Sequence, residues 1–415
     1  MTNAQTSQPQ QASVEDYRQD FPALQQTISG HPLVYLDSAS SAQQPASVID
    51  TVAEYQRNDH SNVHRGVHTL SHRATEAYEG ARDKIQGFIN AASRNEIIHT
   101  SGTTESINLV AQSYCRPLLS AGDKILTTEL EHHSNIVPWQ LVCGQTGAEL
   151  LVVPMDERGQ LNLDELDKLL TADVRFMAIG HVSNALGTIN PVKEIIAKAH
   201  ALDIPVLVDG AQGVPHMQID VQDLDCDFYA FSGHKMYGPT GTGILYGREK
   251  LLEAMPPYKG GGDMIIEVSF EGTVFNELPY KFEAGTPNIS GVIGLGAAVD
   301  YLQSVGLQQI AQHESRLLDY MTQEVGKIDG IRLIGTAENK ASVQSFLLGD
   351  IHAHDLGTIL DHQGVAIRTG HHCAMPVMSF FKVAGTARAS LGLYNNIADI
   401  DQLIVALKKA QQLFS

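Results

Sequence analysis

Two neighbouring segments of the chain place reactive side chains directly after apolar runs that we interpret as buried strands. The run IPVLV is followed by Asp209 and then Gln212, and the run DFYAF by Ser232, His234, Lys235 and a glycine-rich turn. A buried carboxylate needs a cationic or hydrogen-bonding partner, because desolvating it alone costs several kcal/mol or more. An acid, a lysine, hydroxyls and glycines at the ends of parallel strands predict a site for pyridoxal 5′-phosphate. This cofactor requires a Schiff-base lysine, an acid for its pyridine nitrogen and donors for its phosphate.

A donor-rich loop, TSGTTES at residues 100–106, follows the apolar run EIIH and opens a helical segment. Its free backbone N–H groups and hydroxyls would face outward at the positive end of a helix dipole, where phosphate binds readily. Taken alone, the pattern favours an ordinary helix cap, because Ser, Thr and Gly are preferred there anyway. Beside the Asp209 and Lys235 segments, we interpret the loop as the phosphate site.

Six segments, including those that carry Asp209 and Lys235, give the chain a resemblance to a known family when they are taken together. They are EHHSNIVPW, HVSNALGTINP, VLVDGAQ, FSGHKMYGPTG, FEAGTPN and RTGHHCAMP. Over residues 35–393 the chain resembles the cysteine desulfurases of aminotransferase class V, and most closely their short-loop group of the SUF pathway. This resemblance implies a fold-type I pyridoxal-phosphate transferase of the α/β class. It would have a large domain with a mostly parallel mixed sheet and a smaller α+β domain.

The resemblance also implies a role for each matching residue. Lys235 would be the Schiff-base lysine and the base that moves the α-proton, Asp209 the partner of the pyridinium nitrogen, and Gln212 a hydrogen-bond partner of the phenolic oxygen. His132 would stack on the pyridine ring and relay the substrate thiol proton. The other implied ligands are Thr103, Thr104, Ser232, His234 and, from a second subunit, Thr286 for the phosphate, and Arg388, Asn184, Arg368 and His64 for the substrate. For His64, a plain structural role is an equal alternative.

Cys373 distinguishes the chain from an ordinary aminotransferase. It lies in RTGHHC, a glycine-containing stretch that predicts a loop able to reach into the site. A free thiol has a pKa of about 8.5 and is only a few per cent ionised at neutral pH, so Arg368, His371 or His372 could raise the thiolate fraction. We expect the thiolate to attack the sulfur of bound L-cysteine, leaving L-alanine and a persulfide on Cys373.

The short segment AMPVMSFFKVAGTA separates Cys373 from Arg388. This compact arrangement resembles the short-loop group, in which a SufE-like acceptor protein must come to the thiol because the loop cannot carry it far. The resemblance further implies a destination in iron–sulfur cluster assembly and a homodimer in which Thr286 completes the partner's site. Selenocysteine lyase is the expected side activity, since a selenolate is the better leaving group.

The composition and net charge of the chain argue against several classes of binding partner. The 415 residues carry Lys+Arg 28 against Asp+Glu 47, a net charge of −19 that repels phosphate backbones and anionic lipid, so we expect no nucleic-acid partner. No apolar run approaches the length of about 18 residues that a membrane span needs, so we expect no membrane partner. The four cysteines are scattered and the N-terminus lacks an export signal, which predicts a cytoplasmic protein. Cys115, Cys143 and Cys226 are expected to be packing residues.

The elements that must position these residues follow from alternating apolar runs and amphipathic segments. Continuous β-rich runs separated by helices indicate a mostly parallel sheet covered on both faces, with ligands at the carboxyl ends of its strands. Residues 289–305 predict a long helix. We expect residues 1–29 to be a tail and a segment packed on the small domain, 30–290 the large cofactor domain, and 291–415 a linking helix and the small domain with Cys373 and Arg388.

Three other interpretations of these residues compete with this one. His371, His372 and Cys373 beside His132 and His133 could form a metal cluster, but they lack the usual zinc-ligand spacing, so no metal site is predicted. Transamination or kynurenine cleavage would use the same lysine, aspartate and arginine, but neither uses a thiol. A non-catalytic scaffold that docks sulfur-transfer partners would not need the complete cofactor set.

Overall fold

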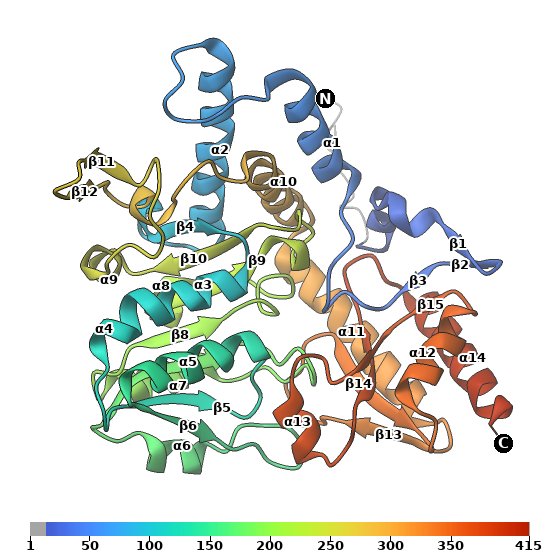
Figure 1. Cartoon of the computed structure of the whole chain (residues 1–415). Coiled ribbons are helices and arrows are strands. Elements are labelled where there is room, and N and C mark those ends of the chain that lie inside the picture. The colour runs from blue at the N-terminus through green and yellow to red at the C-terminus, as the bar shows by residue number, and fades with distance from the viewer. Residues whose placement is uncertain (1–13, 415) are drawn as a thin grey trace, which may run out of the picture.

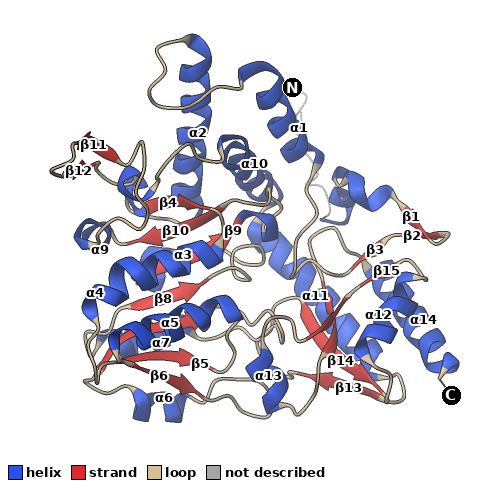
Figure 2. Cartoon of the chain, viewed as in Figure 1, coloured by secondary structure: helices blue, strands red, loops and turns tan. Residues whose placement is uncertain are grey.

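The computed structural model describes residues 14–414, arranged around two sheets that lie side by side (Figures 1 and 2). The predicted loose tail over the first dozen residues lies outside the described part of the chain. Within residues 14–414, no helix combines the length and the apolar character that crossing a membrane requires.

The large sheet has seven strands in the order β4-β10-β9-β8-β7-β5-β6, of which β10 alone is antiparallel to its neighbours. The fold class predicted from the sequence, a mostly parallel mixed sheet of fold type I, is confirmed. The carboxyl ends of the six other strands therefore share one edge. In chain order the strands are β4 Ile97–Thr100, β5 Lys124–Thr128, β6 Glu149–Val153, β7 Val174–Gly180, β8 Val206–Asp209, β9 Phe228–Ser232 and β10 Gly243–Gly247.

Helices cover both faces of the large sheet, which explains why its strands are almost continuous apolar runs. In β8, for example, Leu207 packs into one hydrophobic core while Val206 and Val208 pack into the other. One face is covered by α3 Thr103–Val110, α5 Val137–Thr146 and α9 Glu249–Ala254, and the other by α2 Thr69–Phe88, α6 Leu163–Leu169, α7 Val192–His200, α8 Val221–Leu224 and α10 Ile289–Val305. The bounds of α10 coincide with the predicted long helix.

The second sheet is antiparallel, with four strands in the order β13-β14-β17-β16. Together with α11 Leu307–Gly326, α12 Ala353–Asp361 and α14 Ile397–Leu413 it forms a core of its own, in which Val34 and Leu36 of the N-terminal segment also take part. Its strands are β13 Ile331–Ile334, β14 Val343–Leu348, β16 Arg368–Gly370 and β17 Thr386–Ser390.

The N-terminal segment packs on this C-terminal part. Strand β3 Val34–Tyr35 pairs in parallel with β15 Val365–Ala366, and Arg18 forms an ion pair with Asp399 of α14 at 2.9 Å. The domain boundaries at residues 30 and 290 stay a prediction. The remaining α-helices and strands of the described chain are α1 Ala46–Glu54, α4 Arg116–Leu118, α13 Met375–Phe380 and the two hairpins β1 Thr27–Ile28 with β2 His31–Pro32 and β11 Ile265–Val268 with β12 Thr273–Phe275.

Candidate active site

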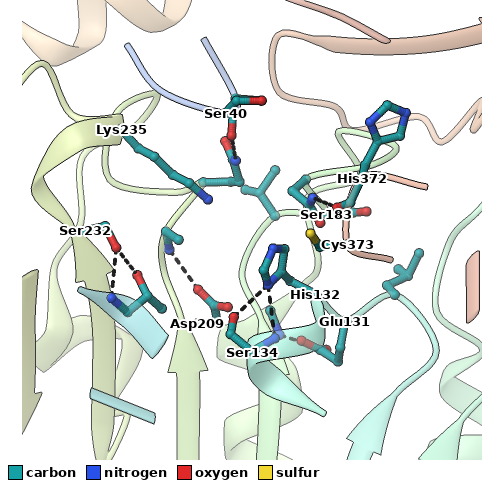
Figure 3. A pocket seen from close by; sticks show the side chains of 18 of the residues that line it. Ser40, Glu131, His132, Ser134, Ser183, Asp209, Ser232, Lys235, His372 and Cys373 are labelled. Carbon is teal, nitrogen blue, oxygen red and sulfur yellow. Dashed lines mark hydrogen bonds between the residues drawn. The ribbon is translucent and has the colours of Figure 1, made fainter. Parts of the chain in front are cut away.

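A cavity of about 210 Å³ lies where the carboxyl edge of the large sheet faces the second sheet. Most of the residues singled out in the sequence line it, and Figure 3 shows several of them around its centre. They are Thr103, Thr104, His132, Asn184, Asp209, Gln212, Ser232, His234, Lys235, Arg368, Cys373 and Arg388. Two predicted residues, His64 and Thr286, are not among its lining.

Lys235 and Asp209 come from adjacent strands and share one electrostatic environment. Asp209 is the last residue of β8, and Lys235 ends the short helical turn Gly233–Lys235 that follows β9. Burial lowers the pKa of Lys235 to about 8, although the charge of Asp209 acts in the opposite direction. Burial likewise raises the pKa of Asp209, against the influence of Lys235 and of a hydrogen bond that its Oδ1 accepts from Ala211 N at 3.0 Å. About a tenth of the lysine is therefore neutral at pH 7, far more than of an ordinary lysine.

The predicted phosphate loop lies beside β9. Helix α3 begins at Thr103, whose N–H donates to Ser232 Oγ at 2.8 Å and whose own hydroxyl lies 2.7 Å from the same atom. The loop backbone passes very close to β10, because a Cβ at Gly243 would lie 2.3 Å from Gly102 Cα. Burial, and then the charge of Lys235, lower the pKa of the neighbouring His234 to about 4, so this imidazole is neutral. Hydroxyl and N–H donors thus converge at a helix N-terminus, where the acid of the loop, Glu105, accepts from Ser101 N at 2.6 Å and not from Thr103.

His132 stands between Lys235 and Cys373 in the view of Figure 3. Burial, followed by the charges of Lys235 and nearby basic groups, lowers the pKa of His132 to about 3. Its Nδ1 accepts a hydrogen bond from Ser134 N at 3.1 Å and lies 2.7 Å from Ser134 Oγ. Since a backbone N–H can only donate, Nδ1 is unprotonated and the neutral ring carries its proton on Nε2.

Two arginines occupy directly paired positions of the second sheet, Arg368 on β16 and Arg388 on β17. Arg388 is buried, and its terminal nitrogens donate to Asn184 O at 2.9 Å, Asp37 Oδ1 at 3.0 Å and Ser40 Oγ at 2.7 Å. Arg368 donates to the same Ser40 hydroxyl at 3.1 Å. The N-terminal segment thereby orients both guanidinium groups toward the cavity edge.

Cys373 lies in the loop between β16 and α13. It is the one partly exposed thiol, whereas Cys115, Cys143 and Cys226 are free, buried thiols whose pKa values burial raises. Both His372 and Cys373 have left-handed backbones, with φ of 53° and 54°. The loop predicted to reach into the site therefore places its thiol in the cavity wall in a conformation that is unusual for residues other than glycine.

Some cavity residues were not singled out in the sequence. Glu131 is buried, and burial raises its pKa to about 7. Its carboxyl group accepts three hydrogen bonds, from Thr128 Oγ1 at 2.6 Å, Gly180 N at 2.9 Å and Asn135 Nδ2 at 2.6 Å. Glu131 directly precedes His132 in the sequence, and this adjacency could have pointed to a place in the cavity. Ser40 carried no comparable signal, because its place depends on the packing of the N-terminal segment.

His64 and Thr286 lie elsewhere in the described chain. His64 Nε2 is 2.8 Å from Glu79 Oε1, and its ring packs edge-on against Tyr78 and Tyr280. These contacts agree with the structural alternative, and a role in substrate binding stays a prediction. Thr286 is exposed on the loop that precedes α10, so it does not complete the cavity of its own chain.

The residues present fit pyridoxal phosphate. Buried polar atoms at this site lack a hydrogen-bond partner, namely Gln212 Oε1, Asn184 Oδ1 and Arg388 Nε, although neighbouring polar atoms are paired. Buried polar atoms without a hydrogen-bond partner lower the stability of the fold unless a bound group supplies that partner. Together with an acid at a strand end, a buried lysine and a cluster of hydroxyl donors, they match the acid, amine and anion contacts that the cofactor needs. Across residues 14–414, no three His, Cys, Asp or Glu side chains come together as a metal-binding group.

Comparisons with known proteins agree with this geometry. The family model of class V aminotransferases matches residues 34–403. The cysteine desulfurase of Enterobacter sp. (strain 638) is 52% identical over 401 residues, which are 96% of this chain and 98% of the relative. The crystal structure of the cysteine desulfurase CsdA from Escherichia coli, in its S-sulfonic acid form, is 42% identical with a TM-score of 0.90, and covers 97% of this chain and 99% of its own. A more distant structure, of a C-DES lysine-to-alanine variant with glycine covalently linked to its pyridoxal-phosphate cofactor, covers 94% of this chain and 98% of its own. At 22% identity and a TM-score of 0.80 it shows the fold alone.

Proposed function

The chain belongs to the class V aminotransferases and, among them, to the cysteine desulfurases, and from this premise we propose that it takes sulfur from L-cysteine as a persulfide on Cys373. The observation that carries the proposal is that Cys373 and Lys235 line the same cavity. A carbanion-stabilising site and a nucleophilic thiol in one cavity are what desulfuration needs and transamination does not.

Enzymes of this family depend on pyridoxal phosphate, which supplies the electron sink that lets bonds at the substrate carbons break. In this chain Lys235 would hold the cofactor covalently, Asp209 would pair with its pyridine nitrogen, and Gln212 would contact its phenolic oxygen. The phosphate would be held by Thr103, Thr104, Ser232, His234 and, from a second copy of the chain, Thr286. The exposed position of Thr286 outside its own cavity supports that last assignment and, with it, a homodimer.

Lys235 and His132 would carry out the proton transfers. The amine of Lys235, with its pKa lowered to about 8, is a suitable base for the substrate α-proton at neutral pH. His132 would relay the substrate thiol proton. Because its pKa is about 3, the ring holds one proton at neutral pH, so a proton accepted at Nδ1 by way of Ser134 Oγ, 2.7 Å away, would be matched by release of the proton on Nε2.

The substrate carboxylate would bind Arg388, supported by Asn184. The Nε of Arg388 has no partner, so it can donate to a carboxylate without giving up a contact. Asp37 and Ser40 hold the other side of the guanidinium, which fixes the plane in which that donor points. Arg368 lies close enough to share Ser40 and would add positive charge near the substrate and the thiol.

In the sulfur step, the Cys373 thiolate forms a bond to the substrate sulfur while the bond from that sulfur to the substrate carbon breaks. The electron pair of the broken bond stays on carbon, where a proton completes L-alanine. The transferred sulfur remains on Cys373 as a persulfide. Atoms and charge balance without any external oxidant or reductant.

We further propose that a SufE-like protein removes this sulfur for iron–sulfur cluster assembly. The loop from His371 to Ala374 is short and fixed by backbone hydrogen bonds, which favours an acceptor that comes to the thiol. Selenocysteine would react as a second substrate because selenium leaves carbon more readily. All four cysteines are free thiols, as expected for the reducing cytoplasm.

Mass spectrometry of the Cys373 peptide after incubation with L-cysteine tests the proposal. We expect a gain of one sulfur on that peptide, absent from the peptides of the buried Cys115, Cys143 and Cys226. Replacing Cys373 by Ala should abolish sulfide release and leave the cofactor absorbance unchanged. Full sulfide release by that variant would refute the assignment, transamination without sulfur transfer would favour another class V reaction, and a colourless protein that binds no cofactor would favour a scaffold.

A further inference from the structure

His133 contacts the Cys373 loop at two points, although the sequence assigned it no role. Its backbone N–H donates to Cys373 O at 2.7 Å, and its side-chain Nε2 accepts from Met375 N at 3.1 Å. A second imidazole, that of His371, accepts from Cys373 N at 3.1 Å through Nδ1, and the two rings lie 5.6 Å apart. Two histidines therefore hold the backbone on both sides of the thiol.

The loop needs such contacts because of its backbone conformation. Consecutive residues in the left-handed region, here His372 and Cys373, are disfavoured unless the surroundings fix them. His372 is fixed on one side, since its carbonyl accepts from Asn184 Nδ2 at 2.6 Å and its Nε2 lies 2.8 Å from Thr386 Oγ1. The backbone after the thiol, up to the first residue of α13, is fixed by His133.

His133 is itself part of a rigid turn at the edge of the large sheet. The preceding Glu131 ties that turn to β5, β7 and Asn135 through its three hydrogen bonds, and Trp139 Nε1 donates to Asn135 Oδ1 at 3.0 Å. His133 thus links a firmly held turn of the large sheet to a strained loop of the second sheet. A contact of this kind sets where the thiol lies relative to the cofactor cavity.

We propose that His133 is a positioning residue that latches the Cys373 loop onto the large sheet and so holds the thiol in the cavity during attack on the substrate sulfur. The inference rests on the proposed function, in which Cys373 is the sulfur acceptor. The latch requires His133 Nε2 to be unprotonated, because that atom accepts from Met375 N. Burial, and then the charge of His371, lower the pKa of His133 and keep the ring neutral.

Hydrogen–deuterium exchange of the holoenzyme tests the latch directly, since its donors are backbone amides. In His133→Ala the amides of residues 373–375 should exchange about five- to tenfold faster, as expected for losing one hydrogen bond. His133→Gln, whose side-chain oxygen reaches about as far as Nε2, should restore slow exchange. His352→Ala is the matched control, because His352 accepts from His354 N at 3.3 Å at the start of α12 in the same part of the fold. It should loosen α12 and leave the amides of residues 373–375 unchanged.

The same variants are then mixed with L-cysteine, and the rate of persulfide formation on Cys373 is measured by rapid quench and mass spectrometry. We expect His133→Ala to be slower by about tenfold or more, because small displacements of a nucleophile cost rate steeply. His133→Gln and His352→Ala should react near the wild-type rate, and all variants should keep the cofactor absorbance. Unchanged exchange in His133→Ala, fast exchange with a wild-type rate, or failure of His133→Gln to recover would each overturn the latch. A wild-type protein that forms no persulfide on Cys373 defeats the proposed function instead, while the exchange data still judge the latch.

Discussion

The pH dependence with which the cofactor-free protein captures pyridoxal phosphate tests the electrostatics of the cavity quantitatively. Burial lowers the pKa of Lys235 from 10.5 to about 8. Only a neutral amine attacks an aldehyde, so lowering this pKa increases the reactive fraction at every pH below about 10.5. At pH 7 about a tenth of Lys235 is neutral, against about one part in 3000 of an ordinary lysine, which is a gain of about 300-fold.

The assay follows cofactor capture by stopped-flow absorbance from pH 6 to 10, with Nα-acetyl-lysine measured in parallel as an amine of ordinary pKa whose rate keeps rising through this range. The protein's rate should rise about tenfold per pH unit and level off near pH 8. Asp209→Asn removes a charge that raises the pKa of Lys235, so the bend should move to lower pH. Borohydride reduction and peptide mapping should place the label on Lys235 and not on Lys340, whose pKa burial also lowers to about 8 but which lies outside the cavity. A rate that keeps rising to pH 10, or a bend that moves upward in Asp209→Asn, would refute the reasoning.

Three further changes probe other parts of the structure. Arg388→Lys should raise the KM for L-cysteine by about tenfold or more at unchanged cofactor absorbance, because an ammonium cannot replace a planar fork, and steady-state kinetics will show it. Gly243→Ala forces a Cβ against the phosphate-loop backbone, so thermal unfolding should show a free energy of unfolding lower by about 1–3 kcal/mol, and cofactor titration should show weaker binding. Gly87→Ala is the control: no atom lies within 4 Å of its new Cβ, so it should leave the stability unchanged or raise it. Arg82→Met leaves the buried Glu283 without its bidentate partner, so a denaturant titration should show a free energy of unfolding lower by about 3–5 kcal/mol. Adding Glu283→Gln removes the unpaired charge and should recover part of that loss.

The large sheet could be predicted because its strands are marked by patterns of residues that are adjacent in the sequence. The central strands β8 and β9 are continuous apolar runs, and the polar residue that ends each of them, Asp209 in β8 and Ser232 in β9, must lie at the shared carboxyl edge. The small residues of α10 likewise gave its bounds. Strand β10 was not identified, because nothing in the run GILYG distinguishes an antiparallel strand from a parallel one.

The other half of the site depends on contacts between distant parts of the sequence. Asp37 and Ser40 reach Arg388 only because β3 pairs with β15, more than three hundred residues further along the chain. No pattern within the N-terminal segment signals that pairing. The contacts of His64 were equally hidden, since its partner Glu79 is one of three acidic residues on an amphipathic helix. Motif resemblance could suggest a role for a residue but not the partners that orient it.

The cavity divides its chemistry between the two sheets. Asp209 and Lys235 stand at the edge of the large sheet, whereas Arg388 and Cys373 belong to the second sheet and its loop. Cofactor binding should therefore tolerate small rotations of one sheet against the other, while sulfur capture should not, because it needs the thiol within bonding distance of a substrate held from the opposite side. His133 is the residue that bridges this division at the thiol itself. Loss of its side chain should consequently separate two properties that most damage to such a site would remove together, an intact cofactor spectrum and the formation of the persulfide.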